Sequence, residues 1–336
     1  TAGGAQNLVK NQRILEVKKI LLAGTGPLQL VVAHQLIQAG ADIAAILEVG
    51  DVKGMWLKLM QGMWGNWGYA GDGLRYLQTI RKAGVPIMQN HIITRANGNQ
   101  HVEEAVIARV DKDWRVIHGT QKSLNVDTVC LGYGLVTSTE LTRLAECDHE
   151  YDSGLGGYVP VRSETMETTR KGIFAVGDGA GVAGSQVALA EGRIASIAMA
   201  QALGHAAGAG QTKTLAELQK KLARHHRLRQ VLDEISRPRS GLYELAEDET
   251  VICRCEDITF KQIKTLIQKE GIKAKDIKRK TRVGMGSCGG RICGPILIEL
   301  LLNLGTQVSK QPDGLNVRPP VKPVSLGVLA GAGDNR

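Results

Sequence analysis

The chain has 336 residues, which is enough for two or three domains with separate hydrophobic cores. Hydrophobic residues make up 43% and charged residues 22%, as is ordinary for a soluble globular protein, so composition excludes a disordered chain. The 41 glycines and the low aromatic content of 4% are typical of α/β folds whose helices pack closely on parallel strands.

The positive charge is concentrated near the end of the chain. Lys and Arg number 42 against 33 Asp and Glu, a net charge of +9 that by itself would fit a nucleic-acid-binding protein. The segment from Val251 to Gly294 holds 11 of these cations, only 4 acidic residues, and four of the six cysteines. A basic shell offsets the negative charge of metal-bound thiolates, and the segment holds only one aromatic residue, Phe260, which is too few to stack bases. We therefore predict no nucleic-acid partner.

The sequence shows neither a targeting segment nor a transmembrane segment. Thr1 to Gly4 is small and polar, without the charged and apolar regions of a signal peptide. The best apolar run, Ile296 to Leu304, is short and broken by Glu299. We therefore expect a cytoplasmic protein, in which clustered cysteines indicate a metal rather than disulfides.

Strands and helices alternate from the first apolar run onward. Residues 18–23 predict a buried parallel strand, a turn follows, and residues 28–38 predict a helix before a second strand over 42–47. This unit has the size of a Rossmann half. The further elements expected are a helix over 72–82, a strand over 85–89, an antiparallel insertion through 92–117 and a strand over 126–131.

The turn after the first strand is a candidate nucleotide site. Gly24 and Gly26 match the first two glycines of a dinucleotide turn, in which the second lets a phosphate approach the backbone, whereas Gln29 stands in place of the third. Glu48, at the end of the second strand, could accept a hydrogen bond from a ribose hydroxyl. The pattern predicts a Rossmann fold, and it leaves the ligand open between NAD, another adenine nucleotide and none.

A second nucleotide signal lies at Gly177 and Asp178, between an apolar strand over 173–176 and an Ala-rich helix over 185–203. A strand-to-helix turn in which Asp178 is only a cap would explain the pattern without a ligand. The segment also resembles the second flavin motif of the glutathione-reductase-like family, which implies that Asp178 binds a ribityl hydroxyl of FAD. The first flavin motif of that family is missing from this sequence, so we expect the FAD site to be incomplete here.

Four cysteines near the end of the chain are candidate metal ligands. Cys253 and Cys255 form a C-x-C pair, and after 32 residues Cys288 and Cys293 form a C-x4-C pair beside a glycine-rich run. Thiolates this close can reach one iron or one edge of a cluster, and nearby amide groups can offset their charge. Zinc sites usually use C-x-x-C pairs. The spacing favours an iron–sulfur cluster and leaves zinc or unligated cysteines as alternatives.

Other features indicate packing. Thr259 and Gln262 predict a capping box before an amphipathic helix, and Pro295 predicts the first turn of the last helix. Cys130 and Cys147 are expected to be ordinary packing residues. Three of the four tryptophans lie between Trp56 and Trp67, where helix packing or an interface anchor is favoured over a quinone site.

The cysteine segments closely resemble a known domain. Cys253 to Asp257 and Thr281 to Pro295 resemble the 2Fe–2S domain related to bacterioferritin-associated ferredoxin (BFD), in the C-x4-C variant fused to amine-oxidising flavoproteins. The whole chain resembles the larger subunit of the opine oxidase, hydrogen cyanide synthase and proline or hydroxyproline dehydrogenase group, without the first third of that subunit. The resemblance implies that the four cysteines, Cys253, Cys255, Cys288 and Cys293, ligate a 2Fe–2S cluster.

The same resemblance implies an FAD-dependent oxidoreductase that acts on CH–NH or CH–NH2 donors as part of a complex. Its expected partners are a smaller flavoprotein subunit of the D-amino-acid-oxidase type, which would oxidise the substrate, and a further small iron–sulfur subunit. This chain would pass electrons from FAD through the cluster to an acceptor, which could place it beside a membrane. The alternatives are an NADH-linked reductase and a non-catalytic iron–sulfur or zinc module.

The predicted fold class is α/β, with a Rossmann-like core of two dinucleotide-binding domains followed by a small helical BFD-like 2Fe–2S domain. We place the domain boundaries as follows: an NAD(P)-binding-like domain over 1–132, the C-terminal part of the FAD-binding domain over 133–210, a helical linker over 211–241, the 2Fe–2S domain over 242–305 and an extended tail over 306–336.

Overall fold

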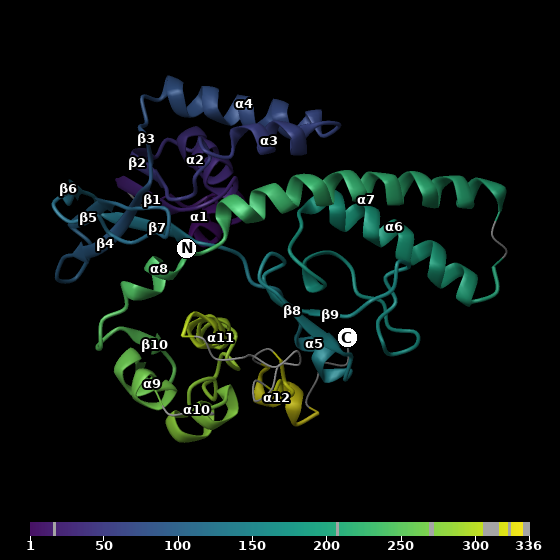
Figure 1. The fold of residues 1–336 in the computed structure, drawn as a ribbon. Helices are drawn as coiled ribbons and strands as arrows, with labels where there is room; N and C mark the ends of the chain where they lie inside the picture. The colour runs from purple at the N-terminus through teal and green to yellow at the C-terminus, as the bar shows by residue number, and fades with distance from the viewer. Residues whose placement is uncertain (16–17, 206–207, 269–271, 305–315, 322–323, 332–336) are drawn as a thin grey trace. The chain divides into compact units, whose positions relative to one another are not determined.

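The computed structural model describes residues 1–15, 18–205, 208–268, 272–304, 316–321 and 324–331 (Figure 1). The chain divides into two compact units. The first comprises Thr1–Leu135 and Gln219–Leu245, and the second comprises Val136–Leu218 and Ala246–Arg336. The long helix α7 (Ala209–Ser236) belongs to both units, so the predicted linker over 211–241 falls partly in each.

A parallel sheet forms the centre of the first unit. Its strands are β1 (Lys19–Gly24), β2 (Asp42–Glu48), β3 (Ile87–Gln89) and β7 (Thr128–Gly132), in the order β3-β2-β1-β7. The register places Gly24 between Glu48 and Gly132, so the glycine turn and the candidate ribose ligand lie at the same edge. This arrangement is that of a Rossmann half, as the sequence predicts.

Side chains on both faces of strand β1 are buried. Ile20 and Leu22 pack on one face with helices α2 (Leu28–Gln38) and α4 (Trp67–Lys82). Leu21 and Ala23 point to the other face, because side chains alternate along a strand. There they meet an antiparallel sheet of β4 (His91–Asn97), β5 (Glu104–Arg109) and β6 (Lys122–Asn125). The insertion predicted over 92–117 accounts for β4 and β5, whereas β6 lies beyond its predicted end.

Three helical segments of this unit are absent from the sequence-based expectation or differ from it. Helix α1 (Ala2–Asn7), with the π-helical turn η1 (Leu8–Gln12), precedes the sheet, and α3 (Trp56–Met63) follows β2. Helix α4 begins five residues before the predicted start. The glycines in its first two turns disfavour a helix by intrinsic propensity, which is why the sequence pattern does not include them.

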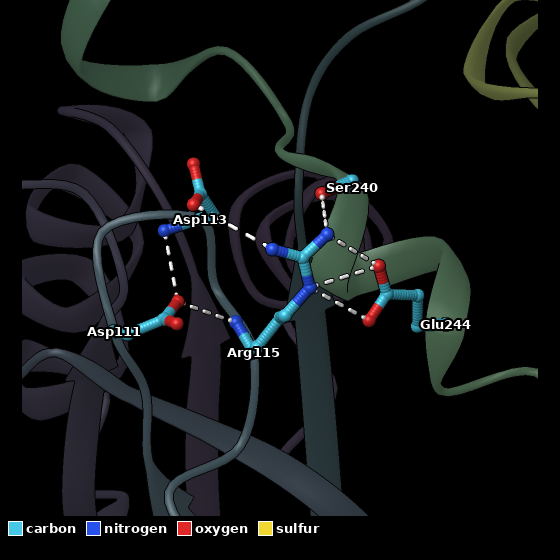
Figure 2. Close-up of polar contacts among 5 residues, drawn as sticks. All are labelled: Asp111, Asp113, Arg115, Ser240 and Glu244. Atoms are coloured by element: carbon cyan, nitrogen blue, oxygen red, sulfur yellow. Dashed lines mark hydrogen bonds and ion pairs between the residues drawn. The ribbon is translucent and has the colours of Figure 1, made fainter. Parts of the chain in front are cut away.

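A polar network fastens helix α8 (Ser240–Glu244) to the loop after β5 (Figure 2). The Arg115 guanidinium donates to both Glu244 oxygens at 2.9 to 3.0 Å and to the Ser240 hydroxyl at 3.2 Å. Asp111 accepts from the backbone amides of Asp113 and Arg115, and so shapes the loop. The segment after α7 is therefore an integral part of the first unit.

The second unit begins with α5 (Glu140–Leu144) and a hairpin of β8 (His149–Asp152) and β9 (Gly157–Pro160). The predicted strand over 173–176 is irregular and forms a single bridge at Phe174, after which η2 (Gly177–Gly179) is one turn of 3-10 helix. Helix α6 (Ser185–Ala202) follows, within one residue of its predicted range.

The cysteine-containing part of the second unit is small and mostly helical. It contains β10 (Val251–Cys253), β11 (Ile258–Thr259), α9 (Phe260–Ile267), α10 (Ala274–Thr281) and α11 (Cys293–Asn303). The predicted capping box of Thr259 and Gln262 is present at the start of α9. The core of this helical part contains the fully buried side chains of Ile263, Ile277 and Leu297. Helix α11 begins at Cys293 rather than after it, so Pro295 is its third residue.

Most of the tail predicted over 306–336 lies outside the described residues. In the described part of this tail, α12 (Leu326–Leu329) is a short helix. Among the residues that the structure describes, no helix is both long and apolar enough to cross a membrane.

Candidate functional site

The four candidate cysteine ligands lie close together in the second unit. Cys253 ends strand β10 and Cys293 begins helix α11, while Cys255 and Cys288 lie on the loops beside them. The Cys253 side chain is within hydrogen-bonding reach of Cys293, and the backbone amide and side chain of Cys288 are within reach of the Cys255 sulfur. Cysteines that are 33 and 40 positions apart in the sequence are thus brought into two contacting pairs.

The two pairs differ in their exposure to solvent. Cys253 and Cys293 are only 2% and 1% exposed, whereas Cys255 is exposed and Cys288 is intermediate. Burial, together with the neighbouring cysteines, raises the pKa of the Cys293 thiol to about 12, and the amide of Gly284 lowers it. By contrast, the backbone amide of Cys288 lowers the pKa of Cys255. A group bound by all four would have one buried side and one side toward solvent.

The glycine-rich loop between α10 and α11 is shaped around the cysteines. A Cβ on Gly286 would lie 2.1 Å from the Cβ of Cys255, so only glycine allows this approach. Gly284, Gly289 and Gly290 have positive φ angles of 80°, 65° and 78°. Two non-glycine residues near the cysteines, Asp257 and Arg282, are also left-handed, and backbone strain of this kind is often found at binding sites.

The donor set of this site is four thiols that lie in two contacting pairs. Within the described ranges, no three His, Cys, Asp or Glu side chains are grouped as a single metal ion would require. A four-cysteine zinc site places all sulfurs about one atom, whereas a 2Fe–2S cluster distributes four thiolates over two irons. The donor set and the two pairs of cysteines are therefore compatible with the predicted cluster.

The candidate nucleotide turn already has a protein partner. Glu48 is buried, and its carboxylate accepts hydrogen bonds from the amide of Gly26 at 3.0 Å and from the amide of Gly50 at 2.8 Å. Burial raises the pKa of Glu48 to about 7, although the bonds from Gly50, Thr25 and Gly26 lower it. The amide of the second glycine, which would face a phosphate, thus donates to the carboxylate that the sequence predicts to bind ribose.

The space beside Gly26 is filled by helix α7. A Cβ on Gly26 would lie 2.9 Å from the Ser236 hydroxyl, and one on Gly50 would lie 2.8 Å from the backbone oxygen of Ile235. In a dinucleotide turn, the missing side chain of the second glycine leaves room for pyrophosphate. Here the C-terminal end of α7 uses that room, so the residues of the turn do not fit NAD in this arrangement.

The predicted flavin ligand Asp178 is exposed in the turn η2. The turn is held by Glu191, which is 2% exposed and accepts from the Gly177 amide at 2.8 Å. The other oxygen of Glu191 pairs with Arg162 at 2.6 Å, and Arg162 also donates to the carbonyl of Ala175. This buried ion pair fixes the backbone that presents Asp178.

Sequence reasoning missed several residues that shape these sites. Ser236 and Glu191 carry no motif, because their roles depend on contacts made by distant helices. Gly286 could have been singled out within the predicted glycine-rich run, although its contact with Cys255 could not. Cys130 and Cys147 are buried, at 5% and 6% exposure, and Cys147 contacts Thr168, in keeping with packing.

Comparison with protein families gives two matches. Residues 5–204 match the pyridine nucleotide-disulphide oxidoreductase family, and residues 251–302 match the BFD-like 2Fe-2S binding domain. The second range contains all four cysteines of the candidate site, and the first contains both candidate nucleotide turns.

Individual relatives resemble nearly the whole chain. An opine oxidase subunit of Rhizobium meliloti is 30% identical over 332 residues, which cover 98% of this chain and 61% of the relative. Hydrogen cyanide synthase subunit HcnB of Pseudomonas protegens is 26% identical over 292 residues, 87% of this chain and 62% of the relative. The chain thus spans a little over 60% of the length of these relatives.

A solved structure with a similar fold is L-proline dehydrogenase from P. horikoshii, with a TM-score of 0.59 and 19% identity over 97% of this chain and 52% of the other. The fold class predicted from the sequence is therefore confirmed. This chain belongs to the pyridine nucleotide-disulphide oxidoreductase family and carries a BFD-like 2Fe-2S binding domain after the family's core.

Proposed function

We propose that this chain is the electron-transferring subunit of an FAD-dependent dehydrogenase or oxidase complex that acts on an amine or amino acid. Its substrate class would be opines, proline-like amino acids or glycine. The observation that carries the proposal is the gathering of Cys253, Cys255, Cys288 and Cys293 inside the range that matches the 2Fe-2S domain. Relatives named as subunits of opine oxidase and of hydrogen cyanide synthase support the oxidoreductase class.

The cysteines would hold the cluster with an inner and an outer edge. Cys253 and Cys293 anchor it to β10 and to the start of α11, where they are shielded from water. Cys255 and Cys288 hold the edge that is open to solvent. When bound, a 2Fe–2S cluster supplies one-electron transfer. The exposed edge supports exchange with a partner, and the buried edge supports retention of the cluster.

The surroundings of the cysteines moderate their charge. The amides of Gly284 and Cys288 point to sulfur, and the helix α11 begins at Cys293, where the helix dipole favours negative charge. Arg282 donates to Glu256 at 2.7 Å and so ties the glycine-rich loop to the loop that carries Cys255. These contacts order both loops around one site.

The flavin end of the proposed path rests on Asp178. The pair of Glu191 and Arg162 holds the η2 backbone, so that Asp178 stands exposed a few residues before helix α6. A carboxylate in this position can accept a hydrogen bond from a hydroxyl of the FAD ribityl chain, as the family resemblance implies. Asp178 would provide one contact to the ribityl chain of FAD.

The relatives are named as subunits, which supports assembly with other chains. We propose that a smaller flavoprotein of the D-amino-acid-oxidase type oxidises the substrate, and that a further small iron–sulfur protein can join the complex. In this arrangement the present chain has no role in substrate chemistry.

An NADH-linked reductase is a second candidate, since the family takes its name from pyridine nucleotides. It would require the turn at Gly26 to accept pyrophosphate. The Gly26 amide already donates to Glu48, and Ser236 lies in the adjoining space, so the geometry favours transfer from an amine-oxidising partner over direct reduction by NADH.

The decisive experiment compares the intact complex with its Cys288→Ser variant. Stopped-flow bleaching of flavin by substrate and steady-state reduction of an artificial acceptor would be measured side by side. We expect bleaching to persist and acceptor reduction to fall by at least about tenfold in the variant, without any need for NAD. If both rates survive unchanged, the cysteine domain is structural. If NADH is obligatory, the reductase candidate replaces the proposal.

A further inference from the structure

Helices α3 and α4 expose an unusually large apolar surface in the first unit. Six side chains on this hairpin are 56 to 70% exposed and define what we call the hairpin surface: Trp56, Leu57, Met60, Trp64, Trp67 and Leu74. In α3 the residues Leu57 and Met60 recur at helical spacing on one face, and Trp64 follows directly after the helix. The opposite face is the packed one, where a Cβ on Gly62 would lie 3.3 Å from the Cα of Leu228.

The area of this surface is of the size that a stable dimer needs. Given about 150–250 Å² for a whole aromatic side chain, the six exposed side chains present roughly 700 Å². The largest apolar patch on a typical monomer is about 300–600 Å². Two such surfaces in contact would bury roughly 1,400 Å², which lies within the range of specific protein interfaces.

The hairpin carries both protruding and recessed features, as an isologous interface requires. Bulky residues project from α3 and from the turn, and Trp64 and Trp67 pack edge to face with ring centroids 5.6 Å apart. The first turns of α4 contain Gly68, Gly71 and Gly73, and a Cβ on any of them would meet nothing within 4 Å. Each costs about 1 kcal/mol of helix propensity relative to Ala. The fold itself gains no close contact from them, whereas a helix of a second copy could approach closely there.

Two of the charges beside the hairpin surface, Lys58 in α3 and Arg75 in α4, are neutralised within the chain. Lys58 pairs with Glu234 at 2.8 Å, and Arg75 pairs with Asp72 at 3.1 Å. Two identical surfaces can therefore meet without Lys58 or Arg75 of one copy facing the other copy as an unpaired charge. A helix that binds membranes instead carries a polar face rich in Lys and Arg that is free to attract lipid head groups.

We propose that the hairpin surface is a homodimer interface, in which α3 and α4 of one chain pack on α3 and α4 of a second copy. The tryptophans and Met60 of one copy would lie over the first turns of α4 in the other, where Gly71 leaves open space. This inference stands independently of the proposed electron-transfer function, because it uses no residue of the cysteine site or of either nucleotide turn.

The test is the association state of the purified 336-residue chain, measured by sedimentation velocity across a concentration series. We expect a dimer at micromolar concentration. Trp64→Asp should raise the dimer dissociation constant by about 30-fold or more, as for a hot-spot residue. The matched control is Leu141→Asp, on α5, because Leu141 is equally exposed at 72% and should leave association unchanged.

A second variant separates association from folding. Gly71→Leu adds a side chain where the chain itself leaves open space, so it should keep or raise the melting temperature of the first unit while weakening the dimer. Gly210→Leu, at another open glycine in a helix, is its control and should leave association unchanged.

Several results would overturn the proposal. The chain could remain monomeric up to about 100 μM, which would mean that any self-association is far weaker than the micromolar dimer expected. The dimer could persist unchanged in both hairpin variants, which would place the interface elsewhere. A monomer that binds phosphatidylcholine vesicles, or that uses Trp64 only to bind a different member of its complex, would assign the surface to another occupant.

Discussion

Two glycine-rich turns of this molecule use the absence of a side chain in opposite ways. Next to Gly26, the open space is taken up by Ser236, and the amide donates to Glu48. Next to Gly286, the open space lets the loop lie directly against Cys255, and Cys288 on the same loop reaches the Cys255 sulfur. The same residue type thus closes one candidate site and forms the other. A glycine motif defines where the backbone can come close, but tertiary contacts decide what it comes close to.

The largest expected effect concerns the cysteine site. In Cys293→Ser, a proposed ligand that is 1% exposed is lost, and iron should fall from about two per chain to near zero. Iron and acid-labile sulfide measured on anaerobically purified protein check this. The control is Cys147→Ser, a buried cysteine outside the site, which should keep its iron. Stoichiometric zinc without sulfide in the unaltered chain would contradict the cluster.

The second prediction distinguishes contact from strain in the glycine-rich loop. Gly286→Ala places a Cβ 2.1 Å from the Cβ of Cys255 and should remove most of the bound iron. Gly289→Ala meets nothing within 4 Å and bears only the cost of its left-handed φ of 65°, about 1 kcal/mol. The visible absorbance of the cluster per chain compares the cluster content of the two variants. Equal loss in both variants would show that loop strain, not the approach to Cys255, controls cluster binding.

The third prediction concerns the closed nucleotide turn and its pH dependence. The pKa of Glu48 is about 7 in the folded chain, raised by burial from its ordinary value of 4.5. The folded state therefore holds this proton more tightly, so the stabilising contribution is complete below pH 4.5 and is lost as pH rises through 7. The loss amounts to about 3 kcal/mol. Urea unfolding of the first unit between about pH 4 and 8 measures it.

The control for that measurement is Glu48→Gln, whose neutral side chain should give a flatter pH profile. Tyr133, which Glu48 influences, has its pKa raised mainly by burial and stays protonated over this range. Parallel profiles in wild type and variant would mean that Glu48 is not the group that titrates.

The smallest expected effect is at the network of Figure 2. Arg115→Ala breaks the bonds to Glu244 and Ser240, but the pair is about half exposed, and exposed pairs contribute little. We expect only a slight decrease in the melting temperature of the first unit, one that shrinks as salt is added. A large decrease would show that α8 is held mainly by this network and not by the contact of Gly241 with Trp114.

The sequence by itself determined the alternation of elements and the positions of the cysteines. Apolar runs such as 20–23 specify a strand buried on both faces, and the apolar spacing over 28–38 specifies α2, because these patterns depend only on near neighbours. The C-x-C and C-x4-C spacing favoured an iron–sulfur cluster over zinc, because ligand spacing within each pair also depends only on near neighbours. The start of α4 could not be predicted, since its glycines act against local propensity and only a helix in its tertiary setting includes them.

The tertiary structure alone decided which sites are open. The motif at Gly24 and Gly26 is that of a nucleotide turn, yet Ser236, from a helix far along the chain, fills the space beside it. Glu191 supports Asp178 from helix α6, and the exposure that separates Cys255 from Cys293 arises from packing. Contacts between distant segments depend on shape and burial summed over the whole fold, which no local spacing of residues encodes.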